Sequence, residues 1–246
     1  MKNILYTFTI LLLALFLVQS CKETDNYVAP NATLKGTVTS SITKQPVEVE
    51  LNNGTAVQLF EINPKYPNPA GQKIPIQENG NYENSKLFSG QYKLLFVDGP
   101  FFPIDTQRVT ISGTTVLNYV LTPYISIDAS TTVSAGTANV TYKLTKGDGP
   151  VQTKIQEARV LVSSIPTVNT TVFDQITTPV AINRSYTNTL TSTSDAVITA
   201  TNYTFSVTGL TSGRTYYIRV GARVANGAGL NASRFNYSSV MKVIIP

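Results

Sequence analysis

The chain of 246 residues contains no histidine and no tryptophan, and it has a single cysteine. The missing histidine removes the commonest general base and the commonest metal ligand of proteins. A Ser-His-Asp or Cys-His arrangement is excluded, and a zinc site would lack its usual imidazole and thiolate ligands. We therefore predict a protein that has no metal and no cofactor.

Charged side chains are also scarce, at 13% of the chain, and the 14 acidic residues are scattered. Two carboxylates are enough for a glycoside hydrolase, which keeps that class open as the least favoured alternative. Many acidic residues, such as Glu48 and Glu50, fall on outward positions of an expected strand. Solvated surface charge is the simpler interpretation, and we predict a protein that is not an enzyme.

The lone cysteine, Cys21, lies where an apolar N-terminal run gives way to a polar chain. The run from Ile4 to Val18 has 15 residues, which as a helix would be about 22 Å long, short of the ~30 Å of a bilayer core. Residues 1–20 are therefore predicted to be a signal peptide. The segment Leu-Val-Gln-Ser-Cys at 17–21 resembles a bacterial lipobox, which implies lipid attachment at Cys21. The alternative is an ordinary secretory signal with a cysteine nearby.

The residues after Cys21 predict where the protein is anchored. Lys22-Glu23-Thr24-Asp25 resembles the surface-export signal of Bacteroidetes lipoproteins. We expect a lipid-anchored protein of the outer membrane that faces the cell surface, with residues 21–31 as its tether. Because Lys2 leaves with the signal peptide, the mature chain has 18 basic and 14 acidic residues. This small, dispersed excess excludes nucleic acid as a partner.

The remaining chain is rich in Thr, Ser, Val, Asn and Tyr, a composition that favours β-sheet. Apolar and polar residues alternate with a period of two in several segments, as in half-buried strands. The fold class is predicted to be all-β, with two β-sandwich domains in series at 32–122 and 123–246. Strands are expected from Ala32 and at 46–51, 91–97, 115–121, 137–144, 157–163, 201–207 and 239–245.

Residues 32–122 resemble the carboxypeptidase-regulatory-like, transthyretin-like β-sandwich family. The motifs that carry the resemblance are Gly36-x-Val38, Pro46-Val47, Asn79-Gly80-x-Tyr82 and Leu87-x-x-Gly90-x-Tyr92-x-Leu94. They describe turns and core positions, and Asn79-Gly80 is a strong signal for a tight turn. The resemblance implies a fold and no active site.

Residues 123–246 resemble a fibronectin type III or Ig-like β-sandwich. Leu210 precedes Tyr216 by six residues, and an alternating strand follows, although Ser212 replaces the usual proline. Tyr216 is predicted to be structural, with its ring buried at a sandwich corner and its hydroxyl bonded back to the chain. The stretch from 164 to 200 is left without an assignment.

Taken as a whole, the chain resembles a two-domain family of Bacteroidetes surface lipoproteins that accompany starch-utilisation-type glycan importers. The supporting segments are the lipobox, the tether segment at 25–36, and 99–103, 122–127, 221–223 and 235–238. The resemblance implies glycan capture or support of a glycan import system. The alternative is a structural or adaptor module that docks to an outer-membrane transport complex.

Aromatic and arginine side chains are the candidates for contact with a glycan, because sugars stack on rings and bond to planar groups. Each candidate has a structural alternative as a loop plug, an exposed sheet face or an interdomain contact. Three groups are selected, in the loop at 99–103, on the outward face of the strand at 216–223 and before the last strand. The candidates are Phe101, Phe102, Tyr217, Arg219, Arg223, Arg234, Phe235 and Tyr237.

Overall fold

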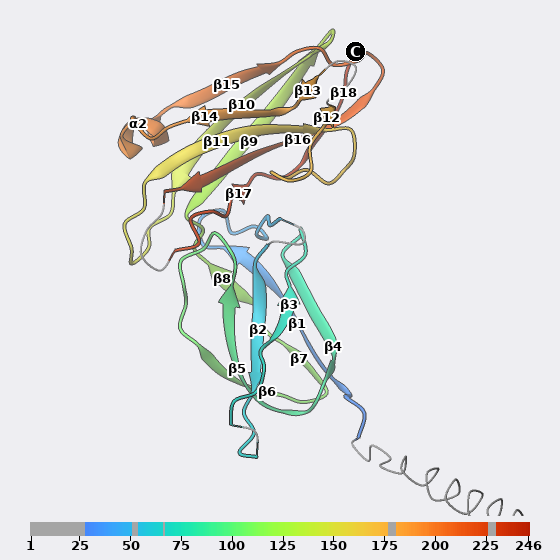
Figure 1. Ribbon diagram of the computed structural model, residues 1–246, viewed down its shortest axis with the longest axis vertical. Coiled ribbons are helices and arrows are strands. Elements are labelled where there is room, and N and C mark those ends of the chain that lie inside the picture. The colour runs from blue at the N-terminus through green and yellow to red at the C-terminus, as the bar shows by residue number, and fades with distance from the viewer. Residues whose placement is uncertain (1–27, 51–53, 66, 177–180, 226–229) are drawn as a thin grey trace, which may run out of the picture. The chain divides into compact units, whose positions relative to one another are not determined.

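The structure is a computed structural model that describes residues 28–50, 54–65, 67–176, 181–225 and 230–246. The predicted signal peptide, Cys21 and the first part of the predicted tether lie outside these residues. The regular secondary structure of the described residues is almost entirely β-strand, as Figure 1 shows, which confirms the predicted fold class. None of the helices in this part of the chain is long and apolar enough to cross a membrane.

The first eight strands build two facing sheets (Figure 1). They are β1 (Ala32–Ser40), β2 (Ala56–Glu61), β3 (Gln72–Pro75), β4 (Asn81–Leu87), β5 (Gly90–Val97), β6 (Gln107–Ile111), β7 (Thr114–Val116) and β8 (Tyr119–Leu121). One sheet has the order β4-β1-β7, with β8 also paired to β1, and the other has the order β3-β2-β5-β6. Leu34 of one sheet and Leu59 and Leu94 of the other belong to the same buried core, as expected for a sandwich.

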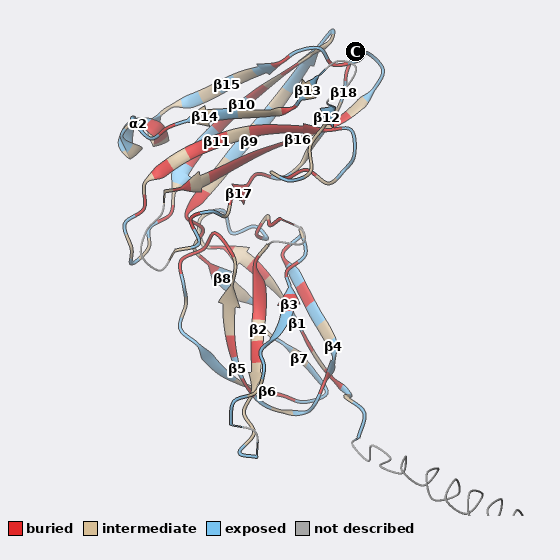
Figure 2. Cartoon of the chain, in the orientation of Figure 1, coloured by how far each residue is buried: buried red, intermediate tan, exposed pale blue. Residues whose placement is uncertain are grey.

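The later strands build a second pair of sheets. They are β9 (Ile125–Ser134), β10 (Thr137–Lys146), β11 (Ile155–Ser163), β14 (Ser185–Thr189), β15 (Asn202–Val207), β16 (Thr215–Val224), β17 (Asn236–Tyr237) and β18 (Met241–Ile244). The sheet orders are β15-β10-β9 and β14-β11-β16-β17, with β18 also paired to β16. Val140 and Ile218 from the two sheets share the second core. Figure 2 colours most of β16 as buried.

Besides β14, three short elements fall in the described part of the stretch 164–200, which the sequence left unassigned. They are a small hairpin of β12 (Gln175–Ile176) and β13 (Ile182–Asn183), and the helix α2 (Asp195–Ala200). Ser194 caps the helix, because its side chain accepts a hydrogen bond from the backbone of Val197. The carboxylate of Asp195 then binds Lys146, Lys154 and the Ile155 N–H, which ties the helix to β10 and β11.

One predicted strand is wrong. The alternating segment at 46–51 has no strand over its described residues 46–50, although Val47 and Val49 are buried as predicted. Glu50, predicted to face solvent, is buried as well. The segment instead faces the second sandwich, where the carboxylates of Glu48 and Glu50 bind the side chains of Arg219 and Tyr237.

A second predicted strand, at 115–121, is divided into β7 and β8. At the break, the carbonyl of Leu117 accepts a hydrogen bond from the Tyr82 hydroxyl, and the side chain of Asn118 accepts one from the Thr37 N–H. Gly36 makes this possible, because a Cβ there would lie 1.7 Å from the Leu117 oxygen. The remaining predicted strands correspond to β1, β5, β10, β11, β15 and β18.

Candidate functional site

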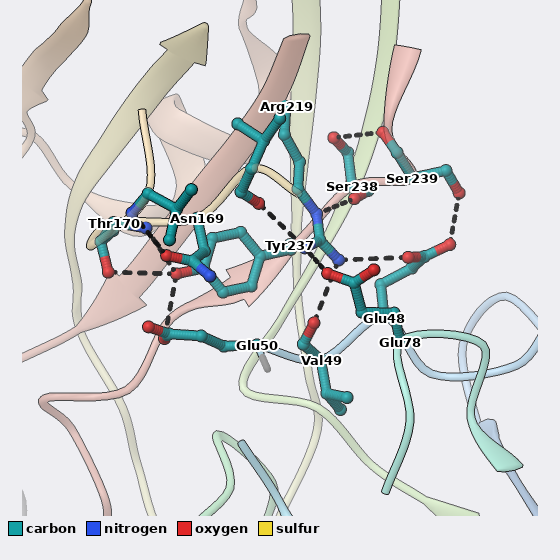
Figure 3. A network of polar contacts seen from close by, with 12 residues as sticks. Glu48, Val49, Glu50, Glu78, Asn169, Thr170, Arg219, Tyr237, Ser238 and Ser239 are labelled. Atoms are coloured by element: carbon teal, nitrogen blue, oxygen red, sulfur yellow. Dashed lines mark hydrogen bonds and ion pairs between the residues drawn. The ribbon is translucent and has the colours of Figure 1, made fainter. Parts of the chain in front are cut away.

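The guanidinium of Arg219 lies at the meeting of the two sandwiches and is 0% exposed (Figure 3). Its Nε donates to the Ser238 carbonyl at 2.8 Å and Nη1 to the Val168 carbonyl at 3.1 Å. On the side of the first sandwich, Nη2 donates to Glu48 Oε2 at 3.1 Å and to the Val49 carbonyl at 3.3 Å. We call this contact set, together with Glu50, Glu78 and Tyr237, the arginine junction.

All three nitrogens of the Arg219 guanidinium donate hydrogen bonds within the arginine junction. Nη1 also lies 3.9 Å from Glu78 Oε1, and the guanidinium lies over the Tyr237 ring at 4.5 Å. Burial lowers the pKa of Arg219, while Glu48 and other nearby groups act in the opposite direction. A buried charge with this set of partners is a structural cation, and its burial closes it to a ligand.

Tyr237 forms the second polar link of the junction. Its hydroxyl donates to Glu50 Oε2 at 3.2 Å and accepts from the Thr170 N–H at 3.2 Å (Figure 3). Burial, followed by the charge of Glu50, raises the pKa of the Tyr237 hydroxyl. The tyrosine therefore stays protonated at neutral pH and can serve as a hydrogen-bond donor to the Glu50 carboxylate.

The segment Gly99-Pro100-Phe101-Phe102-Pro103 connects the two cores and was predicted to be a loop with candidate ligand contacts. Phe101 packs into the first core and Phe102 into the second, where its ring meets Tyr124 edge-on at 5.0 Å. The side chain of Asn236 donates to the Pro100 carbonyl at 3.1 Å and accepts from the Ile125 N–H at 3.0 Å. Both phenylalanines are therefore buried, as in the loop-plug alternative.

The outward face predicted for Tyr217, Arg219 and Arg223 is not an open surface, and Arg219 corrects that prediction most clearly. A small third cluster covers the same face of β16, made of Leu161, Val168, Phe235 and Tyr237 with Phe173, Tyr217 and Val240 beside it. The chain from 164 to 173 supplies part of this cover. The sequence left that stretch unassigned, so the burial of Arg219 had no signal in the strand pattern.

The other predicted residues take different places. Arg223 is half-buried and its Nε lies 3.0 Å from Glu157 Oε1, while its guanidinium lies 5.5 Å from the centre of the buried Phe235 ring. Arg234 is half-buried. The Tyr216 ring is buried, and its hydroxyl accepts from the Thr211 N–H at 3.2 Å, which is the contact expected of a tyrosine corner.

A groove of about 360 Å³ opens beside the arginine junction, and we call it the junction groove. Such a volume is within the range of small-ligand sites, about 300–1,000 Å³. Its lining combines polar and apolar side chains and comes from both sandwiches. The lining residues include Ser40, Thr43, Gln45, Pro46, Glu48, Asn79, Phe101, Pro123, Ser126, Ile127, Tyr237 and Ser239.

The polar side chains of the junction groove divide into two classes. Glu48 is engaged at both oxygens, with Oε2 on Arg219 and Oε1 accepting from the Ser239 hydroxyl at 2.7 Å. In the described part of the chain, by contrast, the side chains of Gln45 and Ser126 have no hydrogen-bond partner. The groove therefore offers an amide and a hydroxyl to a ligand. Sequence reasoning missed both, because only aromatic and arginine side chains were selected as candidates, although Ser126 lies within the segment 122–127.

The described residues hold no group of three or more His, Cys, Asp or Glu side chains that could bind a metal ion. The polar and apolar lining of the junction groove instead suits a neutral organic ligand. Hydroxyl and amide groups can bond its polar substituents, and proline and isoleucine can contact its apolar surface.

Comparison with known proteins finds one family model that matches part of the chain. Residues 32–122 match the model described as the N-terminal domain of a protein of unknown function, DUF3823. No curated protein matches the chain.

Solved structures of DUF3823 proteins resemble the chain over both sandwiches. One from Bacteroides uniformis is 22% identical, with a TM-score of 0.73, and one from Bacteroides ovatus is 20% identical, with a TM-score of 0.65. A second Bacteroides uniformis protein, named as a proposed carbohydrate-binding protein, is 23% identical with a TM-score of 0.73. Each match covers 88% of this chain and 100% of the other. At these identities the DUF3823 structures show a shared fold.

Proposed function

We propose that this protein binds glycan without altering it chemically, as a lipid-anchored protein on the outer surface of the outer membrane in support of a glycan import system. The observation that carries the binding proposal is the junction groove. There the side chains of Gln45 and Ser126, without partners among the described residues, line the groove together with the apolar Pro46 and Ile127. The likeness to a protein named as a proposed carbohydrate binder supports the same class of ligand.

The charges around the groove favour a neutral sugar. Glu48 lines it, and Glu50 and Glu78 lie close behind in the arginine junction. The one arginine among these carboxylates, Arg219, is buried and engaged, so it cannot form a fork with a uronic-acid carboxylate. Like-charge repulsion disfavours an acidic sugar here, whereas hydroxyl groups can bond to the amide of Gln45 and to Ser126.

The affinity is expected to be low. Capture of a long glycan at a cell surface works through repeated weak contacts, which gives a dissociation constant near the micromolar-to-millimolar range, or about −4 to −8 kcal/mol. Contact of apolar sugar faces with the apolar side chains of the groove would supply part of this free energy.

Calorimetry on the chain from Lys22, titrated with neutral polysaccharides chosen from a glycan array, tests the proposal. Ser126→Phe fills the groove and should abolish the heat of binding. Ser130→Phe is the matched control, since it lies on the same face of β9, is exposed and does not line the groove. Binding that survives Ser126→Phe, or release of new reducing ends from the polysaccharide, would contradict the proposal.

The anchor proposal rests on the sequence around Cys21 and has its own test. Cys21→Ala should block lipidation and move the protein from the outer-membrane fraction to the soluble or unprocessed fraction. Protease added to intact cells should remove the wild-type protein if it faces the surface. A variant that still fractionates with outer membranes would overturn the lipid anchor, and full protection from protease would overturn the surface location.

Docking to an outer-membrane transport protein is the alternative function, and one observation favours it. Val116 of β7 and Val120 of β8 are 55% and 59% exposed on strands at the edge of a sheet. Exposed apolar residues on an edge strand can receive a partner's strand or side chains. Stable co-purification with a membrane partner, lost in Val116→Lys/Val120→Lys, together with no heat for any glycan would favour this function.

A further inference from the structure

A second hollow lies on the outer face of the first sandwich, away from the residues of the arginine junction. Its volume is about 570 Å³, and we call it the proline hollow. Its lining residues are Phe60, Glu61, Ile62, Asn63, Pro64, Pro67, Asn68, Pro69, Lys93, Leu95 and Thr106. Three prolines, an aromatic ring and a lysine in one hollow distinguish it from the junction groove, which has no cation in its lining.

The strand register explains the floor of the hollow. Phe60 of β2 lies opposite Lys93 of β5, and Lys93 lies opposite Arg108 of β6. Residues directly opposite each other in antiparallel strands share a face, so these side chains form one row across the sheet. Gly71 lies next to Phe60, and a Cβ there would be only 2.8 Å from the ring. The ring therefore packs against backbone on that side.

The row contains an uncompensated pair of like charges. Lys93 and Arg108 are both exposed, and neither has an ion-pair partner among the described residues. Like charges directly opposite each other destabilise a sheet. The neighbouring Lys73 differs, because it is paired with Asp98. Glu61 also lines the hollow, and its Oε1 accepts from the Asn63 side chain at 3.3 Å.

We propose that the proline hollow binds an acidic sugar residue of a polysaccharide. The apolar face of the sugar ring lies against Phe60 and Leu95, and its carboxylate or sulfate group lies between Lys93 and Arg108. An anion at that position removes the repulsion between the two cations, and arginine can bind it with two parallel hydrogen bonds. Asn68 and Thr106 supply polar groups for the sugar hydroxyls.

Charge complementarity selects this occupant over a neutral glycan, and the ring and proline surfaces select a sugar over a simple anion. The proposal shares with the junction groove only the expectation that the chain binds glycan. It uses different residues, and it requires an acidic sugar, whereas the junction groove favours a neutral one. The two sites can therefore fail independently, because a Ser126→Phe chain retains the proline hollow and a chain altered at Lys93 retains the junction groove.

The test is calorimetry of the chain from Lys22 with polygalacturonate, dextran sulfate, dextran and polyglutamate. The double variant Lys93→Gln/Arg108→Gln should lose about tenfold or more in affinity for an acidic polysaccharide, equal to about 1.4 kcal/mol. Its control, Lys86→Gln/Lys143→Gln, removes the same charge from exposed positions elsewhere and should bind as the wild type does. Phe60→Leu, which keeps both cations, should also weaken binding.

Comparing the polyanions shows which chemical group of the ligand, carboxylate or sulfate, binds in the hollow. Binding of polygalacturonate assigns the hollow to uronates, and binding of dextran sulfate alone assigns it to sulfated sugars. Polyglutamate that binds as tightly as either polysaccharide would overturn the sugar assignment, because it carries charge without a sugar ring. An equal loss in both double variants, or no binding of any acidic polysaccharide, would overturn the site itself.

Discussion

The arginine junction and the proline hollow both combine cationic and aromatic side chains. The cation is buried and paired in the junction, whereas the cations of the hollow are exposed and unpaired. In the junction, Arg219 has a carboxylate, three carbonyls and an aromatic ring as partners and is closed to solvent. In the hollow, Lys93 lies opposite Phe60 and Arg108 lies opposite Lys93, and neither cation has an ion-pair partner among the described residues. The comparison teaches that a cation near an aromatic ring indicates a ligand site only where the cation is exposed and has no ion-pair partner.

The largest expected effect on stability is at Arg219, the buried arginine of the junction. Arg219→Met keeps much of the side-chain volume but leaves Glu48 and the Ser238, Val168 and Val49 carbonyls without their donor, so we expect a loss of ~3–5 kcal/mol in unfolding free energy. Urea denaturation measures it. Arg223→Met on the same strand is the control and should cost at most ~1 kcal/mol, because Arg159 still binds Glu157. Equal losses would remove the distinction between a structural and a peripheral arginine.

Tyr237→Phe tests the second link of the junction and should have an intermediate effect. It removes the hydroxyl that donates to the buried Glu50 while keeping the ring under Arg219. Leaving a buried carboxylate without this donor should lower the unfolding free energy by about 1–3 kcal/mol. The same denaturation series measures the change. A neutral result would mean that Glu50 finds another partner and that Arg219 alone joins the sandwiches.

Tyr216→Phe provides the reference for a tyrosine hydroxyl without a carboxylate partner. The hydroxyl accepts a hydrogen bond from the Thr211 N–H, and the phenylalanine keeps the ring that faces Arg184, so the loss should cost about 1 kcal/mol. The unfolding free energy should therefore fall less than in Tyr237→Phe. A larger loss in Tyr216→Phe would contradict the view that the charged partner makes the junction tyrosine the more important one.

The smallest effect on stability is expected at Lys93, an exposed residue of the proline hollow. Lys93→Gln removes one member of the like-charge pair with Arg108, so stability should change by no more than about 0.5 kcal/mol, and the change should be a gain at low salt. Denaturation at low and high ionic strength measures the sign. A clear loss of stability would show that Lys93 has a structural partner, and the hollow would then resemble the junction.

The sequence predicted the all-β fold because period-two patterning and turn signals act locally. Gly80 adopts a φ of +77° as the Asn79-Gly80 signal requires, and Tyr216 is buried as its spacing from Leu210 suggested. The division of the predicted strand at 115–121 and the missing strand at 46–51 depend on contacts distant in sequence, such as Gly36 with Leu117 and Glu48 with Arg219. Such contacts leave no periodic signal.

The candidate site was harder to predict for the same reason. Alternation along β16 correctly predicted Ile218 and Val220 as inward-facing, but it also predicted an open face for Arg219. That face is covered by a connection without regular structure, which carries no pattern to recognise. Phe101 and Phe102 were chosen for their loop position, and the structure divides them between two cores. Gln45 and Ser126 were not selected, because they are neither aromatic nor arginine side chains.

Hydrogen exchange measured by mass spectrometry on the wild-type chain, with and without saturating polysaccharide, tests the central claim most directly. A neutral glycan should protect peptides that cover 40–48 and 125–127, and an acidic glycan should protect those that cover 60–65 and 93–95. Exchange at Arg219 and its neighbours on β16 should be slow in all samples, because that region is already closed. Protection centred on β14 and β15, or faster exchange in β16 on binding, would contradict the account.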